Sequence, residues 1–540
     1  MNPLNYKYTP FIIALVASIF LSAGIGSVHL FDWDEINFAE SAREMILTKD
    51  YLTVQINFKP FWEKPPLFFW LQAGSMQLFG INEFAARFPN VIFGFLTLIT
   101  TFAVGKRYAG ERFGLLWMLV YIGSFLPQIY FKTSIIDPVF NYFIFMSLVC
   151  YVEAINEVDR PVSFSLLSGL FAGLSFLTKG PVGILLIVLC VLVHLISTKG
   201  RGFPAFKLLT GMVCGFLLPA MIWIGAELYF HGAAFLQKFL IYQVELFTKP
   251  VASHGQPFYY HFIVVLIGCF PMSIVALAAF NKRFGSTHSF SRWMKILFWV
   301  VIILFSISKT KIVHYSSMTW LPLSYLAACV LHEGKVLEYN IQKILYWLIG
   351  GMISLALLFS TLFFHYPSLW LHYIKDAAFI ASYRQMIVPT VLLPATGLVF
   401  TAGLVYAYFL AVKSQPLKSA VVWALTQTGV ITALYYLLLP SIESLSQGPL
   451  ITLVTKVKNE PALIYTYGFK SYAHFYYGER TTANSSNEYL PAGQLAADES
   501  RRLIYYISKE PNHELDTVKG FQFILKEGGY RLYKKEPIGN

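Results

Sequence analysis

Residues 10–35 read PFIIALVASIFLSAGIGSVHLFDWDE, an apolar run that ends directly in the acidic sequence Asp32-Trp33-Asp34-Glu35. A hydrocarbon core about 30 Å thick needs roughly 20 apolar residues per helix, so this run predicts a membrane span near 10–30. Carboxylates packed this tightly beside a span are costly unless they bind or react. The loop that follows the span is therefore the first candidate for a functional site.

The whole chain has the composition of a polytopic membrane protein. Its 540 residues are 56% hydrophobic, 17% aromatic and only 13% charged, unlike a soluble domain. The net charge of +12 fits basic residues that anchor helices to anionic headgroups, and no basic stretch is long enough to indicate nucleic acid. Hydropathy predicts about thirteen spans, near residues 10–30, 84–105, 113–130, 137–155, 163–179, 181–198, 207–229, 258–280, 293–308, 316–334, 342–364, 386–412 and 419–440.

Lysine and arginine gather in alternate connections between these spans. The basic connections contain Lys106, Arg107, Arg112, Lys199, Arg201, Lys207, Lys282, Arg283, Arg292, Lys295, Lys413 and Lys418. Such loops are expected to face the cytoplasm. The opposite, exterior face then holds the loops at 31–83, 230–257, 308–317 and 365–385 together with the C-terminal tail.

The tail differs in composition from the rest of the chain. Hydropathy falls after about residue 441, and residues 462–467, 503–507 and 521–525 read as short strands separated by polar turns. We therefore predict a membrane domain over 1–440 and a small exterior α/β or α+β domain over 441–540.

The first exterior loop contains two predicted interfacial helices. Ile36, Ala39 and Ile46 follow helical spacing with polar residues between them, which is typical of a helix lying on the membrane surface. Asp34 would lie at its N-terminus. A helix cap explains Asp34 equally well, but a cap does not require Asp32 too.

The second helix of this loop is predicted to follow Glu63-Lys64-Pro65-Pro66. Residues before proline are extended, and Pro66 fits the first turn of a helix over 67–79. The positive end of that helix and the charge of Lys64 together suit a phosphate. The alternative is a capping turn with a solvated lysine.

Three more motifs place charged side chains at the same face. Asp137, before Pro138, starts a predicted span and is either another cap or a catalytic group. Lys179-Gly180-Pro181 is a tight hairpin in which a lysine at a helix C-terminus is favourable in any case. The turn Ser308-Lys309-Thr310-Lys311, followed by His314 and Tyr315, could hold a phosphate, although flanking lysines also extend to headgroups.

His254 lies in the sequence His254-Gly255-Gln256-Pro257 of another exterior loop. A lone histidine is usually a hydrogen-bonded loop residue. If it met Glu63 in space, the two side chains could share a divalent metal ion or a proton.

Taken in order, these motifs resemble the bacterial lipid-linked-sugar glycosyltransferases of the GT-C class, in particular the 4-amino-4-deoxy-L-arabinose lipid A transferases and the protein O-mannosyltransferases. The resemblance extends over roughly residues 10–325. It rests on Asp34-Glu35 with Ala39-Glu40 and Ala42-Arg43-Glu44-Met45, on Glu63-Lys64-Pro65-Pro66-Leu67, on Phe176-Leu177-Thr178-Lys179-Gly180-Pro181, on His254-Gly255-Gln256-Pro257, and on Phe305-Ser306-Ile307-Ser308-Lys309-Thr310-Lys311.

The resemblance implies a GT-C fold in a bacterial inner (plasma) membrane, with the active site facing the periplasm. It makes Asp34 the catalytic candidate, puts Glu63 and His254 at a metal site and assigns Lys64 to the donor phosphate. One departure is that Asn37 stands where the aminoarabinose enzymes usually carry an arginine. The donor sugar, a pentose or a hexose such as mannose, and the acceptor, lipid A-like or protein, therefore stay open.

We predict a glycosyltransferase that uses a polyprenyl-phosphate sugar. Its donor phosphate would be bound by a set that comprises Lys64, Arg43, Lys179, Lys309, Lys311 and Tyr315. Asp34, with Asp137, would take the acceptor proton or orient the acceptor, and Asp32 and Glu35 complete the acidic loop. Direct displacement would invert the sugar carbon.

The leaving group in this prediction is a phosphate monoester. A divalent metal ion would therefore help without being obligatory, and no nucleotide cofactor is expected. The competing interpretation is a transporter or lipid flippase, but transporters usually carry ionisable residues at mid-membrane in broken helices and in related halves. Here the charges gather in exterior loops.

Overall fold

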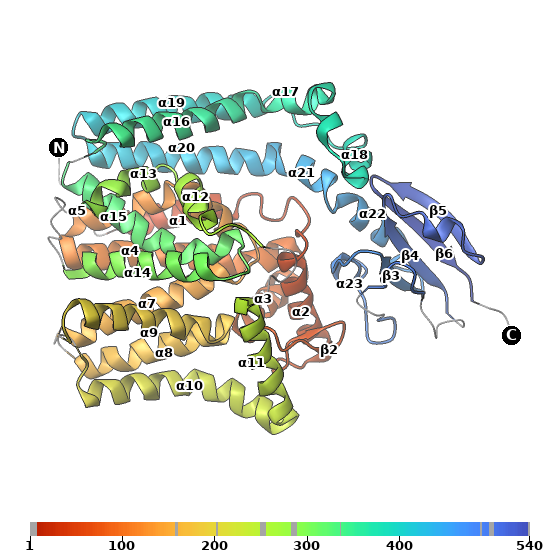
Figure 1. Ribbon diagram of the computed structural model, residues 1–540, viewed down its shortest axis with the longest axis horizontal. Coiled ribbons are helices and arrows are strands. Elements are labelled where there is room, and N and C mark those ends of the chain that lie inside the picture. The colour runs from red at the N-terminus through yellow and green to blue at the C-terminus, as the bar shows by residue number, and fades with distance from the viewer. Residues whose placement is uncertain are drawn as a thin grey trace.

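The computed structural model describes residues 8–156, 160–200, 203–248, 255–281, 289–334, 336–485, 489–495 and 502–537. A bundle of long helices carries a small sheet at one end (Figure 1). Within the described residues, eight single helices are long and apolar enough to cross a membrane. They are α4 (Glu83–Ala109), α7 (Asp137–Ile155), α8 (Pro161–Lys179), α10 (Phe206–His231), α14 (Ser289–Ile307), α16 (Asn340–Leu358), α19 (Leu393–Val412) and α20 (Pro416–Leu437).

Two predicted spans are bent pairs of helices instead of straight ones. The span predicted at 113–130 consists of α5 (Glu111–Ile122) and α6 (Phe125–Phe131), bent by 74°. That predicted at 258–280 consists of α12 (Tyr260–Gly268), followed by α13 (Met272–Ala276) and the 3-10 turn η2 (Leu277–Phe280), bent by 112°. Pro271 lies at this second break, where it lacks an N–H group for the helix ladder.

The predicted number of thirteen spans is not confirmed. Counting each bent pair as one span raises the eight candidates to at most ten among the described residues. The other predicted spans coincide with helices that are too short for that test: α1 (Thr9–Ser22), α9 (Val182–Ser197) and α15 (Trp320–His332). Hydropathy therefore located the apolar segments, but helix length and bending depend on local packing.

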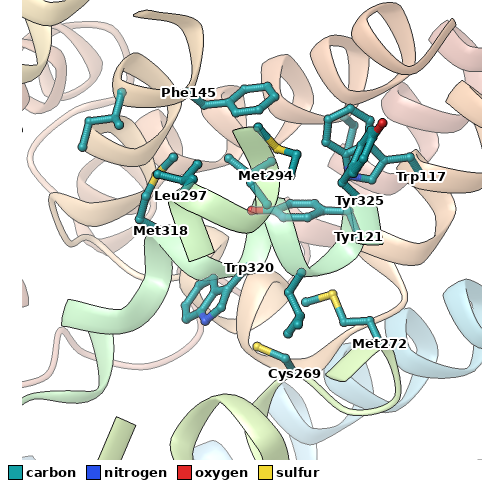
Figure 2. Packing of buried hydrophobic residues seen from close by; sticks show 14 of the residues in the cluster. Trp117, Tyr121, Phe145, Cys269, Met272, Met294, Leu297, Met318, Trp320 and Tyr325 are labelled. Carbon is teal, nitrogen blue, oxygen red and sulfur yellow. The ribbon is translucent and has the colours of Figure 1, made fainter. Parts of the chain in front are cut away.

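The bundle is held together by aromatic packing and by close helix contacts. Trp117 of α5 and Tyr325 of α15 pack with neighbouring methionines in the buried cluster of Figure 2, and the Trp117 indole donates a hydrogen bond to Ser324 at 2.8 Å. Where α4 meets α5, a Cβ atom on Gly105 would lie 2.7 Å from the Cα atom of Gly114. Small residues let the helix backbones approach this closely.

Both helices predicted in the first exterior loop are present, as α2 (Asp34–Thr48) and α3 (Leu67–Phe79), with the short hairpin β1 (Gln55–Ile56) and β2 (Lys59–Pro60) between them. However, every side chain of α2 from Glu35 to Met45 is buried. Helix α2 contacts α3 and α23 (Ala473–Tyr476), and its apolar residues pack with those of the C-terminal domain. It is therefore a core helix that lacks a free polar face.

The C-terminal domain contains a four-stranded sheet in the order β3-β4-β6-β5. Its strands are β3 (Leu463–Tyr467), β4 (Ile504–Lys509), β5 (Phe521–Glu527) and β6 (Tyr530–Lys535). Strands β3 and β4 are parallel, and the other pairs are antiparallel. The first three strands were predicted from the sequence. Strand β6 was not predicted, because its three basic residues interrupt the alternation of apolar and polar residues that marks a strand.

The remaining short elements connect these parts. They are α11 (Ala233–Thr248), η3 (Val313–Thr319), α17 (Ser360–His365), η4 (Pro367–Leu369), η5 (Leu371–Tyr373), α18 (Ala377–Tyr383), α21 (Leu439–Leu445), α22 (Gly448–Val457) and η6 (Glu514–Asp516). Helices α11, α2 and α3 lie at the same end of the bundle, toward the sheet (Figure 1).

Candidate active site

A cavity of about 630 Å³ opens at the end of the bundle that faces the C-terminal domain. This volume is typical of ligand sites. Its walls come from seven separate segments of the chain, which contribute Phe31, Asp32, Trp33, Asp34, Glu35, Asn37, Phe38, Phe61, Glu63, Lys64, Ile136, Asp137, Lys179, Tyr242, Thr310, Ile312, His314, Tyr315, Lys470 and Tyr472.

Asp34 is the first residue of α2, and the capping position before it is occupied by Trp33. The capping interpretation of this residue is therefore wrong. Its side chain is 47% exposed, and its Oδ2 atom lies 4.0 Å from the Nε2 atom of His314. A carboxylate that faces a cavity is placed to accept a proton from a bound group.

His314 lies between two carboxylates. Its Nε2 atom is 4.0 Å from Oδ2 of Asp34 and also 4.0 Å from Oδ2 of Asp137. Burial lowers the pKa of His314, and Asp137 opposes that shift. A neutral imidazole in this position can exchange hydrogen bonds with either acid.

Asp137 forms the closest ion pair in the cavity. It is the first residue of α7, with no capping hydrogen bond, and its Oδ1 atom accepts a hydrogen bond from Nζ of Lys179 at 2.6 Å. Lys179 is the last residue of α8, and its ammonium lies 5.1 Å from the centre of the Tyr315 ring. The ends of two neighbouring helices thus bring an acid and a base together.

Glu63 and Lys64 enter the cavity from the turn before α3. The hydroxyl of Tyr242 in α11 hydrogen-bonds to the Glu63 side chain, and the Gln243 amide donates to the Glu63 carbonyl at 3.3 Å. The Lys64 ammonium lies 5.4 Å from the centre of the Tyr242 ring. Burial lowers the pKa of Lys64, while the charge of Glu63 opposes that shift.

Asp32 joins the cavity to the C-terminal domain. Its carboxylate accepts hydrogen bonds from the Ser471 hydroxyl and from the backbone N–H of Tyr472, the latter at 3.3 Å. Burial raises the pKa of Asp32 to about 6. Lys470 lies over Trp33, with 5.4 Å between its ammonium and the ring centre.

Glu35 also borders the cavity, but both of its oxygens are already used. They accept hydrogen bonds from the Arg87 guanidinium at 2.8 and 3.0 Å, and from the backbone N–H groups of Phe31 and Ser134. Arg87 in turn donates to the carbonyls of Ile25, Val28 and His29. Glu35 therefore holds the loop in shape.

The structure does not bring three other predicted phosphate ligands into the cavity. Arg43 forms a bidentate pair with Glu40 and donates to the Arg480 carbonyl. Lys311 donates to the Ser308 carbonyl at 2.6 Å, and Lys309 is exposed and does not line the cavity. In each case the side chain has a partner or solvent elsewhere.

The metal prediction rested on Glu63 and His254. His254 lies outside the described residues, so this pairing stays a prediction. Within the part of the chain that the structure describes, no three His, Cys, Asp or Glu side chains gather as a metal site.

Sequence reasoning assigned no role to two polar residues that the structure adds to the cavity, Tyr242 and Lys470. The sequence offered no signal for them, because they reach the cavity from an unrelated helix and from the C-terminal domain. His314 lines the cavity from the turn that the sequence assigned to phosphate binding, and Tyr472 lines it from the C-terminal domain.

Comparisons with known proteins agree with this arrangement. Residues 63–224 match the family described as dolichyl-phosphate-mannose-protein mannosyltransferase. Undecaprenyl phosphate-alpha-4-amino-4-deoxy-L-arabinose arabinosyl transferase of Edwardsiella ictaluri is 25% identical over 360 residues, 65% of each chain. The enzyme of the same name from Aeromonas salmonicida is 27% identical over 370 residues, 65% of this chain and 66% of its own length. The matched region thus spans slightly less than two thirds of these two relatives.

The fold similarity covers nearly the whole chain. The crystal structure of ArnT from Cupriavidus metallidurans bound to undecaprenyl phosphate superposes with a TM-score of 0.80, at 16% identity and 98% coverage of both chains. Its apo structure gives a TM-score of 0.74, at 18% identity and 97% coverage of both. The chain is accordingly a multi-pass helical membrane protein with the GT-C fold, and it resembles the lipid A aminoarabinose transferases and the protein O-mannosyltransferases.

Proposed function

We propose that this protein transfers a sugar from a polyprenyl phosphate to an acceptor in the bacterial envelope. The observation that carries the proposal is the convergence of Asp34, Asp137, Lys64 and Lys179 on one cavity at an end of the helix bundle. Acidic and basic side chains that gather in one cavity are typical of a reaction site. The names of the relatives support the same chemistry.

The two lysines suit the leaving group. As the bond between the sugar carbon and the phosphate oxygen breaks, negative charge builds on the phosphate. Lys64 and Lys179 line the same cavity and provide positive charge for it. Preorganised charge of this kind often contributes the largest single part of catalysis.

Asp34 suits the acceptor. An acceptor hydroxyl that attacks the sugar carbon must release a proton as the new bond forms. Asp34 lines the cavity, its side chain is 47% exposed, and its ion pair with His314 is long, at 4.0 Å. The proton passes to Asp34, while the polyprenyl phosphate leaves with the bonding electrons. His314 lies 4.0 Å from both Asp34 and Asp137 and can position the two carboxylates. Attack from the face opposite the phosphate inverts the sugar carbon.

The donor sugar and the face of the membrane are further parts of the proposal. Asn37 lines the cavity, and its buried Oδ1 atom has no hydrogen-bond partner among the residues that the structure describes. A neutral amide favours a neutral sugar such as a hexose. The basic loops at the opposite end of the predicted topology favour a periplasmic cavity in the inner membrane. A divalent ion at Glu63 stays a prediction, and the reaction written here does not depend on it.

The experiment that tests the proposal compares envelope lipids and glycoproteins by mass spectrometry. Cells that lack the protein are complemented with the wild type, with Asp34→Asn or with Lys309→Gln, whose exposed side chain is outside the cavity. One sugar modification should return with the wild type and with Lys309→Gln only, while a polyprenyl-phosphate sugar accumulates with Asp34→Asn. Full restoration by Asp34→Asn at equal expression would contradict the proposal and favour a transporter.

A further inference from the structure

The C-terminal domain contributes side chains to the cavity itself. Lys470 and Tyr472 line it, although they lie more than 400 positions after Asp34 in the chain. They belong to the segment that leaves β3 and leads into α23. Because the segment follows a buried strand, its position is fixed by the sheet behind it.

Hydrogen bonds tie this segment to the catalytic loop. Asp32 accepts from the hydroxyl of Ser471 and from the backbone N–H of Tyr472. The next residue also contributes, because Ser471 accepts a hydrogen bond from the Ala473 backbone at 3.1 Å. The loop and the domain therefore share one polar junction, two residues from Asp34.

Lys470 occupies an aromatic corner of the cavity. Its ammonium lies 5.4 Å from the ring centre of Trp33 and 5.3 Å from that of Tyr472, and these two rings pack edge to face at 5.8 Å. Trp33 is itself 44% exposed. Contact with two aromatic rings gives a cation a defined position.

The cavity thus has two separate cationic walls. Lys64 precedes α3 and Lys470 precedes α23, while α2 contacts both of these helices. In Figure 1, α2 lies between α3 and α11 on one side and α23 and the sheet on the other. Asp34 is the first residue of α2, the helix that contacts both α3 and α23.

A displacement reaction requires this kind of separation. The donor phosphate and the acceptor must approach the sugar carbon from opposite faces, so one cationic wall cannot hold both. Lys64 and Lys179 lie close enough for their charges to interact, and both belong to the wall proposed for the donor. The wall at Lys470 then remains for the second substrate.

An apolar pocket adjoins the cavity near this wall. It encloses about 240 Å³ between α6, α20 and α21, and it shares Phe31 and Glu35 with the cavity. Its other lining residues are mainly aliphatic, such as Leu434 and Ile442. An acceptor with a hydrocarbon chain fits this neighbourhood better than a polar peptide.

We propose that Lys470, Ser471 and Tyr472 of the C-terminal domain, together with Trp33, form the acceptor wall of the active site, and that Lys470 binds a phosphate group of a lipid acceptor. The inference rests on the proposed function, because it assigns the second substrate of the same reaction. It makes the C-terminal domain a determinant of acceptor specificity.

The test measures binding of two lipids to the full-length protein by native mass spectrometry. The probes are undecaprenyl phosphate for the donor wall and diphosphoryl lipid A for the acceptor wall, with dephosphorylated lipid A as the uncharged comparison. Lys470→Gln should weaken diphosphoryl lipid A binding at least about tenfold, the loss expected for one charge-assisted contact. Undecaprenyl phosphate binding should stay within about twofold of the wild type, which also reports that the variant is folded.

Three further variants make the result specific. Lys470→Arg should keep most of the binding of diphosphoryl lipid A, because it keeps the charge. Lys456→Gln, which removes an exposed lysine paired with Glu527 in the same domain, should change neither lipid. Lys64→Gln should show the reverse pattern, with weaker undecaprenyl phosphate and unchanged lipid A.

Failure of the inference and failure of the proposed function give different results. If Lys470→Gln leaves lipid A binding unchanged, or weakens undecaprenyl phosphate equally, the acceptor wall is wrong. Equal binding of lipid A with and without its phosphates also overturns it, as does a wild type that binds undecaprenyl phosphate but no form of lipid A. If the wild type does not bind undecaprenyl phosphate, or Lys64→Gln does not weaken it, the proposed function fails first.

Discussion

Two adjacent carboxylates, Asp34 and Glu35, have opposite environments in this protein. The side chain of Asp34 is 47% exposed, faces the cavity and lies 4.0 Å from the imidazole of His314. The side chain of Glu35 is 6% exposed and forms a bidentate pair with Arg87. Two consecutive residues of α2 therefore differ in role: Asp34 is available for chemistry, and Glu35 holds the site in shape.

The same contrast extends along α2 to the residues that follow. Glu40 is bound by Arg43, and Glu44 accepts hydrogen bonds from the backbone N–H groups of Asn57 and Phe58 in the hairpin that leads to Glu63 and Lys64. Most acidic side chains of α2 are thus held by ion pairs or hydrogen bonds within the protein. The comparison shows that the partners of a carboxylate decide whether it can take part in catalysis or only stabilises the fold.

The largest expected effect is on activity, from Asp34→Asn. Loss of the proton acceptor should reduce the transfer rate by about 10²- to 10⁴-fold, without a change in melting temperature, since Asp34 makes no capping hydrogen bond. Radiolabelled sugar transfer from membranes, with thermal unfolding in detergent, measures both. A fall in stability equal to that of a core variant would mean that Asp34 is structural.

The counterpart is Glu35→Gln, where stability should suffer first. The variant leaves the Arg87 guanidinium buried without its counter-charge, which typically costs about 3 to 5 kcal/mol. We expect low yield and a clearly lower melting temperature than for Asp34→Asn, measured on protein purified in the same detergent. Normal stability with lost activity would instead assign Glu35 to the chemistry.

A smaller effect separates two lysines that the sequence treated alike. Lys64→Gln should weaken undecaprenyl phosphate binding by about tenfold or more, since a hydrogen bond to a charged group contributes about 1.5 to 3 kcal/mol. Lys309→Gln should leave binding unchanged, because Lys309 is exposed and does not line the cavity. Native mass spectrometry provides the affinities. Equal losses from both variants would extend the donor wall to the turn at 308–311.

The smallest expected effect concerns pH and Asp32. Burial raises the pKa of Asp32 to about 6, so the folded protein holds a proton there that the unfolded chain releases near pH 4. Stability from this group is therefore present at low pH and is lost as pH rises toward 6. Asp32→Asn cannot titrate, so its melting temperature should exceed that of the wild type at pH 7.5 by about 1 to 2 °C and match it near pH 4.

Differential scanning fluorimetry across pH 4–8 checks this prediction. Lys456→Gln, which removes a lysine paired with Glu527 and not with the junction, serves as the control for general charge effects. A constant difference between Asp32→Asn and the wild type at every pH would mean that Asp32 does not titrate in this range. The junction with Ser471 and Tyr472 would then act through hydrogen bonding alone.

Much of the membrane domain could be predicted because the bilayer imposes a simple rule on sequence. Apolar length alone located the helices, and the turn before α3 and the starts of α2 and α7 followed from proline and acidic residues at helix ends. Whether a helix is straight or bent could not be predicted in the same way. The bends at 123–124 and 269–271 depend on how neighbouring helices pack.

The candidate site, too, was predicted only in part from the sequence. The sequence by itself determined the chemical types at the helix ends, Asp34, Lys64, Asp137 and Lys179, because charge beside a membrane is expensive and therefore visible. Only the tertiary structure decided where each charge finds its partner: it buried Glu35 against Arg87, bonded Arg43 to the carbonyl of Arg480 and brought Lys470 and Tyr472 beside Trp33. Pairing depends on contacts between residues far apart in the chain, and no local pattern encodes them.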